Sequence, residues 1–254
     1  MRITCILLLV FSLSACTDAG RKGEYELIAH AGGAIDGCLY SNSYEAFERA
    51  VDSGYRFVEF DFVFTADSVL VAAHSWEKFN EISGFSHLRD TALVLSEFLS
   101  RRIYSKYTPL TAADVQELFL LNDSLYLVVD KISDAEVLGN CFPHIKERVI
   151  VEAFSYNDYV SLLDKGFYRV MYSCMAQDVV SSLLKHLVLH RLFSGPRIEW
   201  LALHTSVLEK ISFKIIDALS DYKAALFTVI DTVADIPENF RDRVYMIYTE
   251  SIKP

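Results

Sequence analysis

The stretch FVEFDFVFTADSVLVAAHS, residues 57–75, carries the most information about the fold. Its two apolar runs are separated by the turn signal TADS, and this pattern predicts two buried strands. Glu59 and Asp61 interrupt the first run, and because strand side chains alternate, both point to the same face. Unpaired buried charge is costly, so two such carboxylates either bind a metal ion or form ion pairs with Arg or Lys.

Apolar runs that are typical of strands recur on both sides of this stretch. The further predicted strands lie at 26–29, 125–132, 149–153, 169–173, 199–204, 224–229 and 244–249. The predicted helices lie at 43–53 (capped by Asn42, with Glu45 completing a capping box), 93–103, 111–121, 157–165, 176–193 and 207–220. Alternation of strands and helices with short connections favours a parallel sheet with helices outside it.

Nine predicted strands and a length of 254 residues favour a single (β/α)8 TIM-type barrel domain at 25–254. One of the nine strands must then be wrong or lie outside the barrel. The turn at 65–68 is too short for a helix, so we expect that layer of the barrel to be incomplete. A doubly wound open sheet is the alternative, and it is disfavoured because no G-x-G-x-x-G follows the first strand.

The charge and the cysteines argue against several classes of function. A formal net charge of −10 at pH 7 disfavours a nucleic-acid partner, because such domains are usually basic. Beyond the N-terminal segment, three cysteines remain: Cys38, Cys141 and Cys174. They are widely spaced and odd in number, so they indicate neither a disulfide framework nor a zinc site.

The N-terminal segment has the features of an export signal. Residues 1–15 combine a basic residue with a short apolar run, as in a lipoprotein signal peptide. The sequence LSAC at 13–16 resembles a bacterial lipobox, which predicts lipidation of Cys16 and makes 16–24 a polar tether. We therefore expect an exported, lipid-anchored protein of the bacterial cell envelope, on its periplasmic or surface face. An ordinary signal peptide cut near Ala15 is the alternative.

Five polar residues fall at the C-terminal ends of predicted strands, namely His30, Glu59, Asp61, His74 and Asp130. In a barrel these ends share the face that carries active sites. Carboxylate oxygens suit Mg²⁺ or Ca²⁺, and imidazoles suit proton transfer near neutral pH. The sequence therefore predicts a divalent-cation site flanked by two histidines, with ion-paired carboxylates as the alternative.

The order of these residues resembles the glycerophosphodiester phosphodiesterase family, which belongs to the phosphatidylinositol-phospholipase-C-like barrels. The resemblance runs from Leu27 to Glu250, nearly the whole mature chain. It rests on an ordered set of short motifs: His30-Ala31-Gly32, Ser41-Asn42-Ser43 followed by Ala46-Phe47, Glu59-Phe60-Asp61, Thr65-Ala66-Asp67, His74-Ser75, Asp130 in LVVDKI, Ala153-Phe154, Phe227-Thr228-Val229-Ile230 and Tyr248-Thr249-Glu250.

The resemblance implies a metal-dependent phosphodiester hydrolase that acts on glycerophosphodiesters or related phospholipid head groups. It places one divalent cation, Mg²⁺ or Ca²⁺, on Glu59, Asp61 and Asp130. It implies that His30 and His74 share proton transfer as general acid and base. The candidate substrate-binding residues are Lys131, Asn42, Phe227 and Glu152.

Three departures from the family pattern weaken phosphate recognition. Ala31 stands where the family has a phosphate-binding Arg, and Ser41 stands where it has Glu. Lys131 directly follows Asp130 instead of standing two residues after it, so alternation predicts that it faces away unless a bulge re-aims it. For Glu152, an ion pair with Lys131 inside the barrel is an equally good interpretation.

Two alternative functions follow from these features. A catalytically weak surface lipoprotein that binds a phosphorylated lipid or glycan is consistent with the missing Arg. A sugar hydrolase is consistent with paired carboxylates on a barrel, and it predicts activity that a chelator does not affect.

Overall fold

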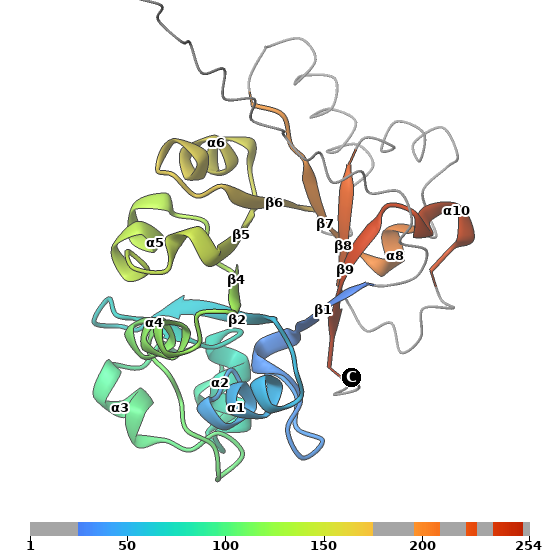
Figure 1. Ribbon diagram of the computed structural model, residues 1–254. Helices are drawn as coiled ribbons and strands as arrows, with labels where there is room; N and C mark the ends of the chain where they lie inside the picture. Colours follow the sequence, from blue (N-terminus) through green and yellow to red (C-terminus); the bar gives the residue numbers. More distant parts are fainter. Residues whose placement is uncertain (1–24, 175–195, 209–221, 228–235, 251–254) are drawn as a thin grey trace, which may run out of the picture.

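The computed structural model describes residues 25–174, 196–208, 222–227 and 236–250, and these residues form a closed parallel barrel (Figure 1). The ring closes because β1 (Glu26–Ala29) pairs in parallel with both β2 (Phe57–Phe64) and β9 (Val244–Thr249). Its eight described strands, in chain order, are β1 (Glu26–Ala29), β2 (Phe57–Phe64), β4 (Tyr126–Asp130), β5 (Val149–Ala153), β6 (Arg169–Cys174), β7 (Trp200–His204), β8 (Lys223–Phe227) and β9 (Val244–Thr249). The prediction of a (β/α)8 barrel is confirmed.

The ninth described strand, β3 (Leu70–Ala72), lies outside the barrel. It pairs antiparallel with the end of β2, from Phe62 to Phe64, where β2 has already passed its last pairing with β4. The expectation of an incomplete barrel layer was therefore wrong, because the short turn at 65–68 closes a hairpin and does not link two barrel strands. This hairpin returns the chain to the barrel mouth, where the amide of Ala73 donates to the carbonyl of Asp61.

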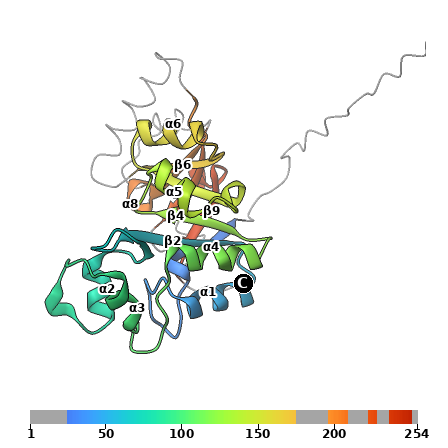
Figure 2. The ribbon, with the colours of Figure 1, turned by 90° about the vertical axis from the view of Figure 1, so that its left-hand side faces the viewer.

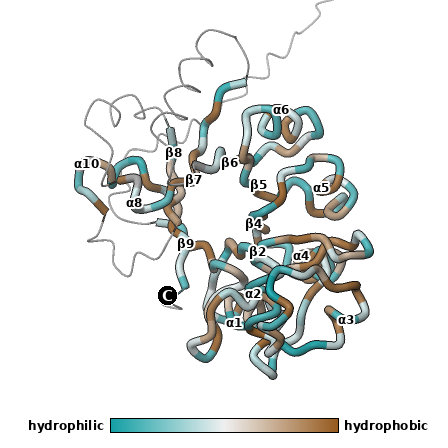
Figure 3. Tube along the Cα trace, turned by 180° about the vertical axis from the view of Figure 1, so that it is seen from behind, coloured by the Kyte–Doolittle hydropathy of each residue, from teal (hydrophilic) through white to brown (hydrophobic). Residues whose placement is uncertain are grey.

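Helices cover the outside of the ring, and side-chain caps begin several of them. Thr111 caps α4 (Ala112–Leu121) through a capping box with Asp114, and Ser75 and Ser155 cap α2 (Trp76–Ile82) and α6 (Tyr156–Asp164). Figure 3 shows that the outer helices alternate between hydrophobic and hydrophilic residues, as helices on a sheet should. The described helices are α1 (Tyr44–Asp52), α2 (Trp76–Ile82), α3 (Leu95–Ser100), α4 (Ala112–Leu121), α5 (Ala135–Cys141), α6 (Tyr156–Asp164), α8 (Thr205–Leu208) and α10 (Glu238–Arg241), with short 3-10 turns η1 (His30–Gly32), η2 (Ser86–Leu88) and η3 (Lys146–Arg148).

An insertion between β3 and α4 carries α2 and α3, which lie together away from α5 and α6 (Figure 2). It has a small core of its own, in which Trp76, Phe79 and Phe98 pack ring against ring. In this region the sequence predicts a helix only at 93–103, so α2 is a correction. Its first turn is stabilised by the Ser75 hydroxyl, which accepts from the amide of Lys78 at 3.1 Å.

One apolar cluster fills the interior of the described barrel. Its buried members are Ile28, Val128, Ile150, Met171, Ala202, Ala225, Met246 and Tyr248. Two residues further along β2 and β4, carboxylates replace apolar side chains on the same interior face. The acidic residues therefore lie at the C-terminal mouth of the barrel, next to the apolar cluster that fills its interior.

Several predicted segments lie outside the described residues. These are the signal peptide 1–15, the tether 16–24 with Cys16, the helix 176–193, and most of the helix 207–220. Within the described ranges, no helix has the length and apolar character needed to cross a membrane.

Candidate active site

Three carboxylates from two neighbouring strands meet at the barrel mouth. Glu59 and Asp61 project from β2, and Asp130 ends β4 directly beside Asp61 in the sheet register. One oxygen from each of the three lies within 4.8 Å of the others. Glu59 and Asp61 are buried, with 1% and 0% of their surfaces exposed. The predicted convergence of these acids is confirmed.

The hydrogen bonds of this cluster leave two carboxylate oxygens without a donor. Oε2 of Glu59 accepts from the amide of Ala31 at 2.5 Å, and Oδ2 of Asp61 accepts from Nδ2 of Asn42 at 3.0 Å. The second oxygens, Oε1 of Glu59 and Oδ1 of Asp61, are buried and have no hydrogen-bond partner in the described part of the chain. Buried polar atoms are normally satisfied, so this oxygen-rich pair fits a hard cation such as Mg²⁺ or Ca²⁺.

Burial and mutual repulsion hold the pKa of both β2 carboxyls above their ordinary values. For Glu59, burial is the largest cause of the raised pKa, followed by the charges of Asp61 and Asp130. For Asp61, burial again leads, followed by the charge of Asp130. The fold therefore holds these carboxyls together at a cost in free energy, which positive charge placed between them would offset.

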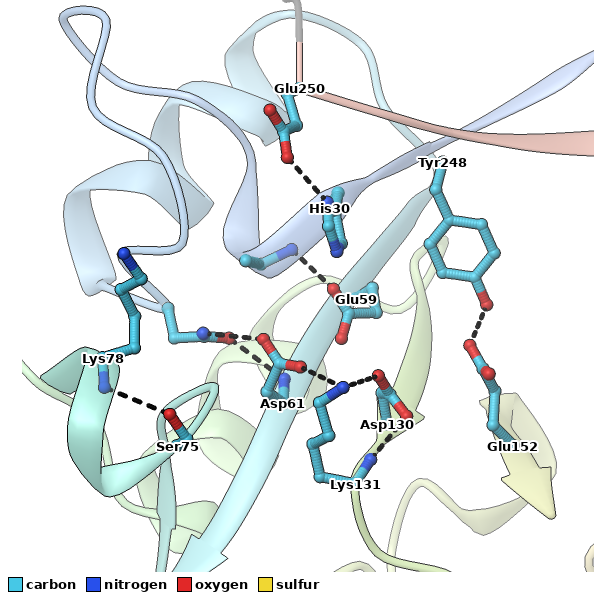
Figure 4. A network of polar contacts seen from close by, with 12 residues as sticks. His30, Glu59, Asp61, Ser75, Lys78, Asp130, Lys131, Glu152, Tyr248 and Glu250 are labelled. Carbon is cyan, nitrogen blue, oxygen red and sulfur yellow. Dashed lines mark hydrogen bonds and ion pairs between the residues drawn. The ribbon is translucent and has the colours of Figure 1, made fainter. Parts of the chain in front are cut away.

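Lys131 points into this cluster, which corrects the prediction that it faces away. β4 ends at Asp130, and Lys131 adopts a left-handed backbone with φ of 68° that re-aims its side chain. Its Nζ lies 3.0 Å from Oδ2 of Asp130 and 3.9 Å from Oδ1 of Asp61 (Figure 4). Burial lowers the pKa of Lys131, but the charges of Asp130 and Asp61 outweigh it and leave the pKa raised, so the ammonium stays protonated.

His30 begins the 3-10 turn that follows β1, and Glu250 holds its ring. Nδ1 of His30 lies 3.2 Å from Oε1 of Glu250, just beyond the end of β9 (Figure 4). The hydrogen bond with His30 is the largest cause that lowers the pKa of the Glu250 carboxyl, which therefore stays ionised and only accepts. Nδ1 of His30 must then carry the proton, and in the neutral ring Nε2 is left with a free lone pair.

His74 reaches the same mouth through the β2–β3 hairpin. It follows Ala73, whose amide is bonded to the carbonyl of Asp61. Burial lowers the pKa of His74, and the opposing charge of Asp61 only partly compensates. Nδ1 of His74 is buried and has no hydrogen-bond partner in the described part of the chain. Both predicted histidines therefore stand at the acidic cluster, one from β1 and one from the hairpin.

Asn42 supports the site and does not cap the helix. Ser43 is the N-cap of α1, because its hydroxyl accepts from the amide of Ala46, so the predicted capping role of Asn42 was wrong. The amide side chain of Asn42 instead binds Asp61 at two points. Nδ2 of Asn42 donates to the carboxylate of Asp61, and Oδ1 of Asn42 accepts from the backbone amide of Asp61, each at 3.0 Å. The predicted partner Glu45 bonds the backbone amide and the hydroxyl of Thr108.

Glu152 and Phe227 lie further round the mouth. The hydroxyl of Tyr248 donates to Oε1 of Glu152 at 2.5 Å. The predicted ion pair between Glu152 and Lys131 does not form, because the ammonium of Lys131 pairs with Asp130. Burial, then the charge of Asp130, raises the pKa of Glu152 to about 8. Phe227 ends β8, and its ring packs edge-on against His204 and Tyr248.

One residue beside the histidines has no signal in the sequence. The ring of Tyr40 lies 5.1 Å from the rings of both His30 and His74, measured between centroids. Tyr40 stands in an irregular loop with φ of 56°, so no strand or helix periodicity places its side chain. By contrast, a motif match marks Glu250, whose bond to His30 only the three-dimensional structure reveals.

Comparison with solved structures shows the same fold in three bacterial proteins. A glycerophosphodiester phosphodiesterase from Parabacteroides distasonis is 19% identical, with 89% of this chain and 92% of that chain covered and a TM-score of 0.62. One from Thermotoga maritima is 17% identical, with 91% and 97% covered and a TM-score of 0.63. A phosphodiesterase from Oleispira antarctica, in complex with the product sn-glycerol-3-phosphate, is 15% identical, with 89% and 92% covered and a TM-score of 0.58.

A match to a family model identifies the family of this chain, whereas the distant structural similarities show only its fold. A search among curated proteins found no significant match. The model of the glycerophosphoryl diester phosphodiesterase family matches residues 25–188, more than half of the chain, including His30, the acidic cluster and His74. The chain therefore belongs to the glycerophosphoryl diester phosphodiesterase family, whose members are phosphoric diester hydrolases.

Proposed function

We propose that this protein hydrolyses glycerophosphodiesters or related phospholipid head-group diesters with the help of one divalent cation and two histidines. The observation that carries the proposal is the set of three carboxylates within 4.8 Å of one another, with His30 and His74 beside them. Family membership supports the reaction class. The Oleispira antarctica phosphodiesterase, which binds the product sn-glycerol-3-phosphate, supports a small phosphodiester as substrate.

Glu59, Asp61 and Asp130 would hold the cation, Mg²⁺ or Ca²⁺; Glu59 and Asp61 each offer a buried oxygen that has no hydrogen-bond partner among the described residues. When bound, such a cation offsets negative charge that gathers on the phosphoryl oxygens. Asn42 keeps Asp61 in place by bonding both its side chain and its backbone amide. The amide of Ala31 holds Glu59 in the same way. These two acids would thus be pre-arranged before the cation arrives, which limits the cost of ordering them.

The surroundings of the two histidines differ, and this difference assigns one to accept a proton and the other to donate one. Glu250 fixes the proton of His30 on Nδ1, so Nε2 is suited to accept a proton from an attacking water or hydroxyl group. His74 then serves the leaving oxygen as general acid. Its lowered pKa makes protonated His74 a stronger acid, although fewer molecules carry that proton as pH rises.

Positive charge for the phosphate comes from a different residue than in the family pattern. Ala31 is buried and its amide is bonded to Glu59, so it offers no side-chain cation. Lys131 supplies an ammonium at the mouth, next to Asp130, and 31% of its side-chain surface is exposed. We infer that Lys131 binds substrate phosphate in the role that the missing Arg would have had. Glu152 lines the mouth on the neighbouring strand β5, and Phe227 lines it at the end of β8.

We further propose that the protein is exported and anchored to a bacterial envelope membrane through a lipid on Cys16. The support is the order of signal peptide 1–15, lipobox LSAC and polar tether 16–24. Mass spectrometry of the mature N-terminus tests it. A diacylglyceryl modification on Cys16 is expected, and a protein released by Cys16→Ser into the soluble fraction supports the same conclusion.

The central experiment measures hydrolysis of glycerophosphodiesters by the purified domain with Mg²⁺, Ca²⁺ or a chelator. We expect turnover that needs a cation, and loss of turnover in His30→Ala and His74→Ala with cation affinity largely kept. His87→Ala, which changes an exposed histidine of η2, serves as the matched control. Near-native rates in the two histidine variants would contradict the assignment of acid and base.

A binding protein is the second candidate, and one observation favours it. Position 31 holds no Arg, and the ammonium of Lys131 is already paired with two of the candidate metal ligands, Asp61 and Asp130. Retained binding of glycerol 3-phosphate, measured by calorimetry, together with no turnover under any cation would favour this second candidate. Hydrolysis of a glycoside that a chelator leaves unchanged would be needed to support the sugar-hydrolase alternative.

A further inference from the structure

Tyr40 touches both histidines of the candidate site although these come from separate parts of the chain. Its ring meets that of His30 at an interplanar angle of 77° and that of His74 at 68°, both with centroids 5.1 Å apart. Among the ring contacts between described residues, no other aromatic side chain pairs with both imidazoles. Edge-to-face contact restricts how an imidazole can tilt, because it favours particular ring orientations.

The hydroxyl of Tyr40 is tied to the same network. It faces Glu250, the carboxylate that accepts from Nδ1 of His30. Glu250 therefore has an imidazole N–H bonded to it and a phenol O–H beside it. Both groups are attracted to the carboxylate, so both restrict its rotation.

The backbone of Tyr40 shows that its position is fixed by the surroundings. Its φ of 56° lies in the left-handed region, which is unfavourable for a bulky side chain outside glycine. Asn42, two residues later, shares this conformation with φ of 46° and is anchored to Asp61. The loop is thus tied to β2 through Asn42 while Tyr40 is directed between the histidines.

We propose that Tyr40 is a positioning residue that holds the two imidazoles in a common orientation for proton transfer. Its ring sets the tilt of His30 and His74, and its hydroxyl keeps Glu250 where it fixes the Nδ1 proton of His30. The proposal rests on the function proposed above, in which both histidines transfer protons. Tyr40 itself does not exchange a proton with the substrate.

Two substitutions separate the ring from the hydroxyl. Tyr40→Phe keeps both ring contacts and removes the hydroxyl that faces Glu250. Tyr40→Leu removes the aromatic edge and the hydroxyl together. The matched control is Tyr44→Phe, because the Tyr44 hydroxyl also lies beside a glutamate: it donates to Glu48 at 2.6 Å, on the exposed face of α1.

The readouts are the nitrogen-15 spectra of the histidine rings and the steady-state kinetics. In the wild type we expect His30 as the Nδ1–H tautomer; in Tyr40→Phe we expect a mixture of tautomers and a kcat about tenfold lower with KM nearly unchanged. Tyr40→Leu should lose about a hundredfold in kcat, and Tyr44→Phe should match the wild type. Melting temperatures show whether each variant is folded. If Tyr40→Leu does not fold, the isosteric Tyr40→Phe alone tests the proposal.

Wild-type kcat in Tyr40→Phe, or a His30 tautomer that does not change, would overturn the proposal. The proposed function fails by a different result, namely near-native turnover in His30→Ala and His74→Ala. The ring spectra report tautomers without any turnover, so the orienting effect of Tyr40 is measured even if that happens. A tautomer change with unchanged kcat shows that orientation by Tyr40 is irrelevant to catalysis, and that result also overturns the proposal.

Discussion

At the scale of single residues, Lys131 competes with a cation for the same oxygens. Its Nζ lies 3.9 Å from Oδ1 of Asp61, one of the two buried carboxylate oxygens that lack a hydrogen-bond donor. A metal ion that binds this oxygen must displace the ammonium or share the carboxylates with it. The ammonium therefore stabilises the metal-free cluster and lowers its affinity for cations.

We expect Lys131→Met to raise the affinity for Mg²⁺ or Ca²⁺ by about tenfold, because the competing charge is lost while the acids remain. Turnover should nevertheless fall, since the ammonium that we assign to the substrate phosphate is missing. Calorimetric titration of the metal-free domain measures the affinity. Lys78→Met is the control, because Lys78 forms an ion pair with Glu81 at 2.7 Å on the surface of α2. Weaker cation binding in Lys131→Met would show that Lys131 helps to hold the ion.

Asp61→Asn tests the acidic cluster itself. The change keeps the shape of the side chain but removes one charge, so cation affinity should drop by more than about tenfold and turnover should be lost. In chelator the variant should be at least as stable as the wild type, because burial and Asp130 both disfavour the ionised form of Asp61. Asp67→Asn makes the same change on the exposed turn of the hairpin. If Asp61→Asn binds the cation as the wild type does, the three-carboxylate site is wrong.

At the scale of elements, the β2–β3 hairpin and α2 together place His74. The imidazole stands between the last strand residues of β3 and the N-cap Ser75, whose hydroxyl holds the first turn of α2. Loss of this cap should therefore affect both stability and the position of the imidazole. α6 begins in the same way, with Ser155 accepting from the amide of Asp158 at 3.1 Å, but outside the insertion.

We expect Ser75→Ala to lower the free energy of unfolding by about 1 kcal/mol, the usual contribution of a serine N-cap. It should also lower kcat several-fold, because the segment that carries His74 becomes less ordered. Ser155→Ala should cost a similar amount of stability and leave kcat unchanged. Urea unfolding and steady-state kinetics on both variants provide the comparison. Equal kcat values in the two variants would show that α2 does not position His74.

The elements that sequence patterns predict well are those in which local signals agree with the fold. α4 has its capping box at Thr111 and Asp114, and β5 is a continuous apolar run, so both appear close to their predicted bounds. β3 is also predicted, but its direction is not, because a three-residue apolar run looks alike in parallel and antiparallel pairing. α2 and α5 were missed because short helices of seven residues carry few periodic positions.

The candidate site was predictable to the extent that it lies on strands. Alternation places Glu59 and Asp61 on one face, and the sheet register then brings Asp130 to them. Lys131 and Asn42 depart from prediction because both have positive φ, which alternation and capping rules do not anticipate. Tyr40 carries no signal for a similar reason. The contacts of loop residues depend on the whole fold and cannot be inferred from neighbours in the sequence.

At the scale of the whole molecule, one buried hydrogen bond joins the two halves of the barrel. Tyr248 of β9 donates to Glu152 of β5, residues 96 positions apart in the chain. Burial is the main cause of the raised pKa of about 8 for Glu152, so the folded protein retains its proton at neutral pH. In an unfolded chain the same carboxyl titrates near its ordinary value of 4.5. Folding therefore couples to proton uptake at this position.

This coupling gives the stability of the barrel a defined pH dependence. Between pH 4.5 and about 8 the unfolded chain has lost the proton that the folded chain keeps, so the free energy of unfolding falls as pH rises through this window. Glutamine cannot ionise, and it can still bond Tyr248. We therefore expect Glu152→Gln to equal the wild type at pH 4 and to exceed its stability by up to a few kcal/mol at pH 9, measured by urea unfolding in chelator. Glu147→Gln, five residues earlier and exposed, should leave the pH profile unchanged. A wild-type slope in Glu152→Gln would place the titrating group elsewhere in the barrel.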